Sequence, residues 1–386
     1  MSSFLDQCQV IIDFIRDQFP NKDFIPLHEP SFNGNEKKYL ADCIDSTFVS
    51  SVGKYVDQFE HMIASYTGVK FAIATVNGTA ALHIALLLAG VEENTEVITQ
   101  PLTFVATCNA IKYCGADPVF IDISQHTLGM CPEKLEIFLK SSTKKTAQGL
   151  LNIHTNKIIK ACVPMHTFGH PVEIDKIVDV CDQFDIPVVE DSAESLGSLY
   201  KNKHTGTFGK LGVFSFNGNK IVTTGGGGMI VTDDEYLAKR AKHLTTTAKV
   251  PHQWDYVHDE IGYNYRMPNI NAALGCAQME HLDQLINIKR ELAKTYQALF
   301  DDLDIKCVQE PDNTRSNYWL QTVLFNDQES RDIFLEMTNK QGVMTRPCWE
   351  LMCQLEMFSD CYKSELMNSK DFALKLVNIP SSVVLC

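Results

Sequence analysis

Residues 213–232 read VFSFNGNKIVTTGGGGMIVT, and this stretch says most about the fold and chemistry of the chain. The apolar runs at 213–216 and 229–232 predict two strands, and Lys220 lies between the first run and four glycines. A lysine in a walled, partly desolvated position can act as a nucleophilic amine. Consecutive glycines let a flat or bulky group approach the backbone. The alternative is a plain strand–turn–strand with an exposed lysine.

Upstream, residues 186–193 read IPVVEDSA and place two carboxylates at the end of a strand rich in β-branched residues. Ligands of open α/β sheets bind beyond the carboxyl ends of the strands. Asp191 could there hold a cationic ring nitrogen in a buried ion pair. The competing interpretation is an N-cap, because small residues follow Asp191.

Further upstream, residues 75–83 read TVNGTAALH, a strand that turns through Asn-Gly into a helix. The free amides at a helix N-terminus bind phosphate, although simple capping explains the same pattern. The order of the three stretches favours a functional interpretation: a phosphate site, then an acid at a strand end, then a lysine flanked by strands.

Strands alternate with helices over the first two thirds of the chain, which predicts a largely parallel sheet covered on both faces. We expect strands at residues 71–76, 96–99, 118–123, 158–164, 186–190, 213–216 and 229–232. We expect helices at residues 4–19, 80–89, from 105, 174–184, 233–244 and 269–303, and an extended arm at 24–33. The domain boundaries that follow are a helical extension at 1–24, a large α/β domain at 25–245 and a small domain at 246–386.

Composition excludes several classes of protein. Among 386 residues, 34 Lys and Arg face 48 Asp and Glu, so the net charge is −14. An acidic chain without a basic block is not typical of nucleic-acid binding or of attachment to anionic membranes. The 13 cysteines include no CxxC pair and favour reduced, buried thiols in the cytoplasm. No metal site is expected, because Gly169 separates His166 from His170 and indicates a loop.

Five motifs in this order resemble the DegT-type pyridoxal-phosphate-dependent sugar aminotransferases. They are NGTAALH at 77–83, PLTFVAT at 101–107, VVEDSAES at 188–195, SFNGNKIVTTGGGGM at 215–229 and GYNYRMPNI at 262–270. The resemblance runs from about residue 25 to the C-terminus. It implies the aspartate-aminotransferase (type I) fold, with a mostly parallel seven-stranded sheet, helices on both faces and a smaller C-terminal α/β domain. It also implies a homodimer whose active sites are shared between subunits.

By this resemblance, Lys220 is the lysine that bonds to pyridoxal 5'-phosphate, and Asp191 pairs with its ring nitrogen. Phe104 takes the place of the aromatic residue that stacks on the ring. Glu194 stands where many members carry His or Gln near the ring hydroxyl, so its role is open. The residues that resemble the phosphate cradle are Gly78, Thr79, Ala80 and Ser215, with Asn264 contributed by the partner subunit.

The chemistry implied is transfer of an amino group from a donor, expected to be L-glutamate, to a keto sugar. The cofactor acts as an electron sink, and freed Lys220 moves the proton as general base and acid. Relatives that replace this lysine with histidine are dehydratases, so Lys220 argues against that activity.

The acceptor is suggested by two stretches, NGNKIVTTGGGGM at 217–229 and TRPCWELM at 345–352. Together they are most similar to members acting on UDP-2-acetamido-2,6-dideoxy-hexos-4-ulose on the way to bacillosamine or legionaminic-type sugars. The residues expected near this acceptor are His28, Asn33, Arg346 and Trp349. Trp349 could equally be core packing, and Arg346 a structural ion pair. One alternative keeps the reaction but uses a GDP- or dTDP-linked 4-keto-6-deoxyhexose of the perosamine type. Another is a regulatory protein that binds the cofactor without turnover.

Overall fold

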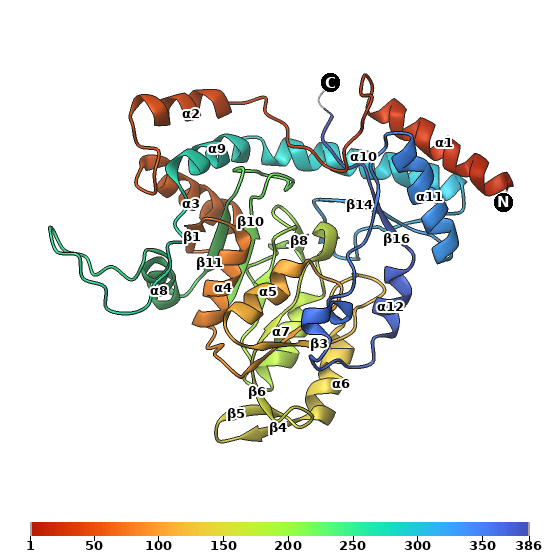
Figure 1. Cartoon of the computed structure of the whole chain (residues 1–386). Helices are drawn as coiled ribbons and strands as arrows, with labels where there is room; N and C mark the ends of the chain where they lie inside the picture. The colour runs from red at the N-terminus through yellow and green to blue at the C-terminus, as the bar shows by residue number, and fades with distance from the viewer. Residues whose placement is uncertain (1, 385–386) are drawn as a thin grey trace.

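The computed structural model describes residues 2–384 and centres on one seven-stranded sheet (Figure 1). Parallel pairs between Cys162 and Val188 and between Met165 and Asp191 join its two halves. The strand order is β3 (Asp117–Phe120), β2 (Glu96–Thr99), β6 (Lys157–Val163), β7 (Val189–Asp191), β10 (Leu211–Ser215), β11 (Gly228–Thr232) and β1 (Phe71–Thr75). Strand β11 is antiparallel to both of its neighbours, and the other neighbouring pairs are parallel. This confirms the expected mostly parallel sheet.

Both faces of this sheet are covered, because successive strand residues point to opposite sides and both sets are apolar. Ile73, Val213 and Ile230 share one core, whereas Ala72 and Met229 share another on the opposite face. The first core includes α4 (Gly78–Leu88), α5 (Val105–Tyr113) and α8 (Glu235–Thr245). The opposite face is covered by α3 (Lys54–Thr67), α9 (Asn269–Met279), α6 (Pro132–Ser142) and α7 (Ile174–Asp182).

A second, antiparallel sheet lies in the C-terminal part, in the order β12 (Lys306–Cys307), β14 (Gln321–Leu324), β16 (Leu376–Ile379) and β15 (Arg346–Pro347). One core contains Ile11 and Ile15 with Tyr296, Phe334 and Val377. The N-terminal helix therefore packs against the C-terminal part (Figure 1), while the domain boundaries at 24/25 and 245/246 stay a prediction. The helices of this core are α1 (Ser2–Gln18), α10 (Leu282–Asp302) and α11 (Gln328–Lys340).

Smaller elements complete the described chain. A hairpin of β4 (Thr143–Thr146) and β5 (Gly149–Asn152) pairs with the start of β6. Three short strands form a separate sheet, in the order β13 (Thr314–Arg315), β8 (Leu199–Tyr200) and β9 (Lys203–His204). The remaining helical segments are α2 (Glu36–Asp45), α12 (Met367–Ala373) and three short 3₁₀ turns at Thr167–Gly169, Met352–Gln354 and Glu356–Phe358.

The expected strands are all present, with ends that differ by a few residues. The single helix expected at 269–303 is wrong, since α9 and α10 are separate. His281 leaves helical geometry there, with φ −116° and ψ 2°. Glu280 beside it accepts hydrogen bonds from Asn35 and Tyr39, so tertiary contacts hold the break. The sequence pattern does not predict α2, α3, α6 or the β4–β5 hairpin.

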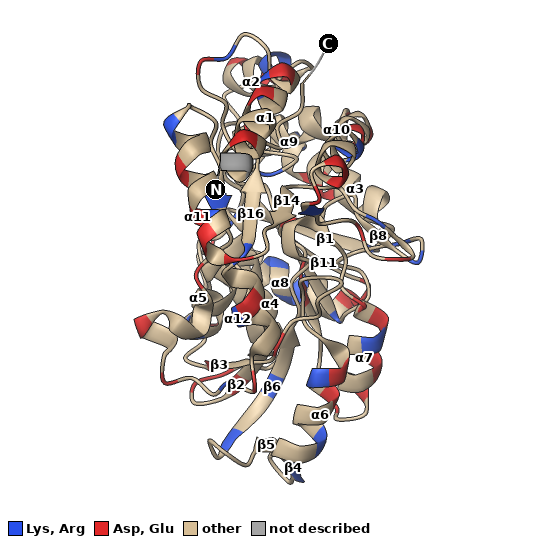
Figure 2. Ribbon diagram, turned by 90° about the vertical axis from the view of Figure 1, so that its right-hand side faces the viewer, with Lys and Arg blue, Asp and Glu red and all other residues tan. Residues whose placement is uncertain are grey.

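Charged residues of both signs are interspersed over the outer helices, as α6 and α7 show (Figure 2). Lys176 of α7, for example, lies 2.5 Å from Glu173 and 3.9 Å from Glu133 of α6. Exposed pairs of this kind contribute little to stability. Among the described residues, no helix combines the length and the apolar character needed to span a membrane.

Candidate active site

A pocket of about 330 Å³ opens where β7 and β10 end and α4 begins. This edge is where open α/β sheets bind their ligands. The pocket is lined by Asn77, Gly78, Thr79, Leu82, Phe104, Ala106, Thr107, Met165, Asp191, Ala193, Glu194, Ser215, Asn217, Asn219, Lys220, Trp319 and Trp349.

Asp191 ends β7 and is buried in the pocket wall. Its Oδ2 accepts a hydrogen bond from Thr107 Oγ1 at 2.7 Å, and its Oδ1 accepts one from the Ala193 amide at 3.2 Å. Burial raises the pKa of the Asp191 carboxyl, while the Thr107 and Ala193 hydrogen bonds and the charge of Lys220 lower it. A buried carboxylate held in one direction is suited to pair with a cation in the pocket.

Lys220 follows β10 and points into the same pocket, with 11% of its side chain exposed. Its Nζ lies 3.3 Å from Glu194 Oε1 and 3.9 Å from the ring centroid of Trp319. Burial raises the pKa of Glu194 to about 7, although Lys220 and the Phe168 amide lower it. The lysine amine is therefore held between a carboxyl group and an aromatic face.

The N-terminus of α4 faces the pocket and is built to leave two amides free. Asn77 Oδ1 accepts a hydrogen bond from the Ala80 amide at 2.7 Å, which caps the helix. The amides of Gly78 and Thr79 precede it, and the first amides of a helix have no acceptor within the helix. A Cβ at Gly78 would lie 2.8 Å from Ser215 Cβ, so the serine sits directly beside the helix tip. Free amides, a hydroxyl and the positive end of a helix together fit a phosphate group.

The last glycine of the run at 225–228 is required by the packing of β11 against the start of α4. A Cβ at Gly228 would lie 2.4 Å from the Asn77 carbonyl oxygen, so β11 can approach the helix start only without a side chain. Gly225 adopts φ +77°, which favours glycine. The turn at Asn77 is thus the backbone that approaches Gly228, and the approach of a ligand to the glycine run stays a prediction.

Aromatic side chains form the outer wall of the pocket. Phe104 is 48% exposed and lies 6.1 Å from Trp349, edge to face. Trp349 packs against buried Phe168 at 5.0 Å. Trp349 therefore belongs to the core and lines the pocket at the same time, so its two expected roles are compatible.

The structure brings together most residues singled out from the sequence, namely Gly78, Thr79, Phe104, Asp191, Glu194, Ser215, Lys220 and Trp349. Ala80 is placed differently, because its amide already donates to Asn77 and the residue does not line the pocket. Asn264 is exposed in the segment after α8, residues 246–268, and lies outside the pocket of its own chain.

The other expected substrate residues, His28, Asn33 and Arg346, do not line the pocket. Asn33 is exposed, and Arg346 donates to Asn339 Oδ1 at 2.9 Å. Burial, with the nearby charges of Lys289 and Lys220, holds the pKa of His28 well below its usual value. Their roles toward a substrate stay predictions.

Several residues that line the pocket are not predicted as site residues from the sequence. Thr107 lies within the PLTFVAT motif, so the spacing from Phe104 could have suggested it. Asn77 begins the NGTAALH motif, and its cap of α4 matches the capping interpretation of that stretch. Trp319 carries no comparable signal, because it is 99 positions after Lys220 and reaches it only through the fold.

One group outside the pocket has the composition of a metal site. The ligand atoms of His243, Asp259 and Glu260 lie within 4.8 Å of one another. Arg240 donates to both carboxylate oxygens of Glu260, so the positive charge beside this exposed cluster is the arginine side chain.

Comparison with known proteins decides the family. The sequence model of the DegT/DnrJ/EryC1/StrS aminotransferase family matches residues 30–386. The chain belongs to this family. The GDP-perosamine synthase of Escherichia coli O157:H7 is 38% identical over 358 residues, 93% of this chain and 93% of that protein. The GDP-perosamine synthase of Vibrio cholerae is 36% identical over 366 residues, 94% of this chain and 95% of that protein.

Solved structures agree with this assignment. Helicobacter pylori PseC, an aminotransferase involved in the biosynthesis of pseudoaminic acid, superposes with a TM-score of 0.84 at 26% identity and covers 92% of this chain and 93% of its own. The type I fold is thereby confirmed. The chain is a pyridoxal-phosphate-dependent nucleotide-sugar aminotransferase.

The residues of the pocket fit the cofactor of this family. When bound, pyridoxal phosphate supplies an electron sink for the carbon that gains or loses the amino group. The tip of α4 and Ser215 would hold its phosphate, Asp191 its ring nitrogen, and Phe104 the face of its ring. Lys220 would supply the amine and move a proton, and Glu194 lies where it can exchange a proton with Lys220 Nζ.

Proposed function

We propose that this aminotransferase moves an amino group from L-glutamate to the 4-keto carbon of a GDP-linked 4-keto-6-deoxyhexose. The product would be a perosamine-type nucleotide sugar for a surface polysaccharide. The observation that carries the proposal is the 36–38% identity to two GDP-perosamine synthases over more than nine tenths of the chain. These relatives favour a GDP-linked acceptor over the UDP-linked one that the motifs suggest.

A UDP-linked 4-keto-6-deoxy-N-acetylhexosamine is the second candidate, in the bacillosamine or legionaminic branch. It is favoured by the stretches NGNKIVTTGGGGM at 217–229 and TRPCWELM at 345–352. A non-catalytic regulator is the candidate of another class, and it is weakened by the lysine, acid and phosphate cradle that line one pocket.

A panel of GDP-, UDP- and dTDP-linked 4-keto sugars, each with L-glutamate, tests the acceptor. Mass spectrometry would detect a product in which one amine replaces the keto oxygen. We expect the GDP sugar to give a kcat/KM at least about tenfold higher, since a tenfold preference needs only about 1.4 kcal/mol. A preference for the UDP sugar would contradict the proposed acceptor and keep the reaction. Release of 2-oxoglutarate from glutamate alone separates a transaminase from a regulator.

We propose further that the enzyme is a homodimer with shared active sites. Large apolar side chains are exposed on the segment after α8, with Trp254 70%, Tyr256 80% and Ile261 84% exposed. Figure 1 shows this segment extending away from the body of the chain. Large apolar side chains that are exposed together in one segment are typical of a protein interface. In the dimer, this segment would bring Asn264 to the cofactor phosphate in the partner's pocket.

We place the enzyme in the cytoplasm. The described cysteines are unpaired, and all but Cys131 are buried. Burial raises the pKa of the Cys8 and Cys361 thiols to about 11, which keeps them unreactive. Thiols of this kind suit a reducing compartment.

A further inference from the structure

Asn317 is a buried amide whose side chain connects two segments of the active site. Its Nδ2 donates to the carbonyl oxygens of Glu194 and Leu196, both at 2.9 Å. Its Oδ1 accepts from the Trp319 amide at 2.8 Å, and its own backbone amide donates to Ser198 Oγ at 2.9 Å. One side chain thus ties the loop after β7 to the segment that leads into β14.

The two tied segments carry the two side chains that contact the lysine amine. Glu194 Oε1 lies 3.3 Å from Lys220 Nζ, and the Trp319 ring centroid lies 3.9 Å from the same atom. Trp319 Nε1 also donates to the Asn219 carbonyl at 2.7 Å, next to the lysine in the chain. The direction of Lys220 therefore depends on where these two segments are held.

We propose that Asn317 is a positioning residue of the aminotransferase. It fixes the carboxyl group of Glu194 and the indole of Trp319 on Lys220 Nζ, so that the amine stays directed at the bound cofactor. Asn317 does not line the pocket and acts through these neighbours.

A strained turn beside Asn317 supports a role beyond filling space. Phe168 adopts φ +57°, which is uncommon for a residue with a side chain, and its amide donates to Glu194 Oε2 at 2.9 Å. A Cβ at Gly169 would lie 2.0 Å from Asn317 Oδ1, so the amide packs directly on this turn. Backbone strain of this kind persists only where the surroundings enforce it, and it clusters at functional sites.

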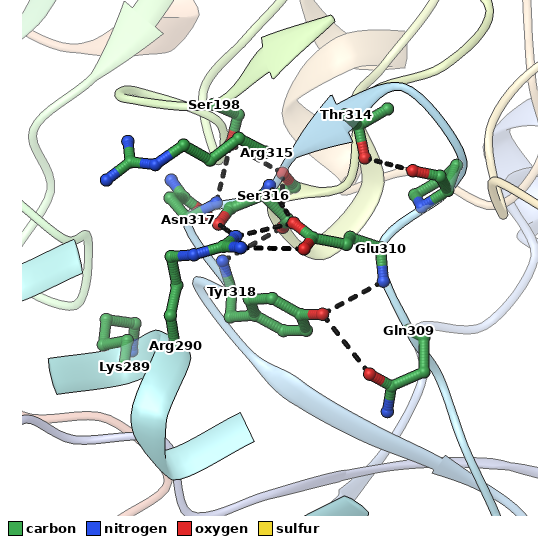
Figure 3. A network of polar contacts seen from close by, with 12 residues as sticks. Ser198, Lys289, Arg290, Gln309, Glu310, Thr314, Arg315, Ser316, Asn317 and Tyr318 are labelled. Carbon is green, nitrogen blue, oxygen red and sulfur yellow. Dashed lines mark hydrogen bonds and ion pairs between the residues drawn. The ribbon is translucent and has the colours of Figure 1, made fainter. Parts of the chain in front are cut away.

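An ion pair anchors Asn317 from the other side (Figure 3). Arg290 of α10 donates to both carboxylate oxygens of Glu310, at 2.6 and 2.8 Å. Arg290 also donates to the Ser316 carbonyl at 2.8 Å, and Glu310 Oε2 accepts from the Ser316 amide at 2.7 Å. Both backbone polar groups of Ser316, the residue before Asn317, are thus fixed by a bidentate, charge-assisted pair.

The test compares Asn317→Ala and Asn317→Ser with Asn152→Ser in the holoenzyme. Asn152 is a matched control: it is fully buried on β5, its Nδ2 donates to Glu96 at 2.8 Å, and its Oδ1 accepts from the His154 amide at 3.0 Å. The readouts are the melting temperature and the pH midpoint at which the visible absorption of bound pyridoxal phosphate changes. A carboxylate held beside the lysine nitrogen raises this midpoint.

We expect both Asn317 variants to lower the midpoint by about 0.5–1 pH unit, because Glu194 is no longer held on Nζ. Asn152→Ser should leave the midpoint unchanged at a comparable loss of melting temperature. Asp191 and His28, whose pKa values also respond to the Lys220 charge, are untouched by these changes. Glu310→Gln should shift the midpoint in the same direction by less.

A midpoint within about 0.2 pH unit of wild type in the Asn317 variants would overturn the proposal, as would an equal shift in Asn152→Ser. Should Asn317→Ala fail to fold, Asn317→Ser decides alone, since its hydroxyl can still donate one of the two hydrogen bonds.

Discussion

Lys289 and Glu194 are buried ionisable residues, and burial favours the neutral form of each. Lys289 of α10 is fully buried and donates to the Ser381 carbonyl oxygen. Burial lowers the pKa of Lys289 to about 7 and raises that of Glu194 to about 7. Near neutral pH both residues therefore make the free energy of unfolding depend on pH, and their contributions to this pH dependence have opposite signs.

Replacing Lys289 with Met should stabilise the protein at low pH. The unfolded chain holds the lysine proton up to about pH 10.5, whereas the folded chain releases it near pH 7. Lys289 therefore costs stability as the pH falls from about 10 to 7. We expect Lys289→Met to raise the free energy of unfolding by about 1–3 kcal/mol at pH 6 and to change it little at pH 10. Urea unfolding at both pH values, with exposed Lys294→Met as the control, measures this; a difference that does not vary with pH would refute it.

Replacing Glu194 with Gln should have the opposite pH dependence. Between the ordinary pKa of a glutamate and about 7, the folded chain binds more protons than the unfolded chain, so stability falls as the pH rises. Without cofactor, Glu194→Gln should be about 1–3 kcal/mol more stable relative to wild type at pH 8 than at pH 5. Parallel pH profiles of the two melting curves would show that Glu194 titrates as an ordinary carboxyl.

At the scale of elements, the site depends on how helix α4 begins. Asn77→Ala removes the acceptor for the Ala80 amide and should cost about 1 kcal/mol of stability. It should also weaken pyridoxal phosphate binding severalfold, because the amides that we propose to face the phosphate lose their support. Asp234→Ala removes the equivalent cap of α8, which accepts from Leu237 at 3.0 Å, and should cost similar stability with unchanged cofactor affinity. Equal cofactor affinity in both variants, measured by fluorescence titration, would contradict a phosphate role for this helix.

The sequence predicts the strands of the central sheet and two residues of the site, but not the contacts between distant segments. Short apolar runs bounded by turn residues predict the strands of the central sheet. Asp191 and Lys220 both follow such strands, and the carboxyl ends of parallel strands lie at one edge of the sheet, so the sequence predicts that these two side chains meet there. Trp319 and Asn317 come from a segment about a hundred residues further along, and no local pattern brings them to Lys220. The break between α9 and α10 is likewise fixed by contacts with Asn35 and Tyr39, which an apolar period does not record.

At the scale of the whole molecule, the segment after α8 should determine assembly. The double variant Trp254→Ser with Ile261→Glu should weaken the proposed dimer at least tenfold, because it removes apolar area and adds charge. Activity should fall with dimer content, since Asn264 would act on the partner's pocket. Sedimentation velocity measures the assembly, and Ile137→Glu on α6, a residue 60% exposed, serves as the control. A wild-type chain that stays monomeric at micromolar concentration would contradict the shared site.

The most direct measurement locates the amine that bonds the cofactor. Borohydride reduction of the holoenzyme, followed by digestion and peptide mass spectrometry, marks the lysine to which pyridoxal phosphate is attached. We expect the mark on Lys220, and none on the buried Lys289 or in a Lys220→Ala variant. Attachment at another lysine, or no attachment in a protein that has taken up the cofactor, would contradict it.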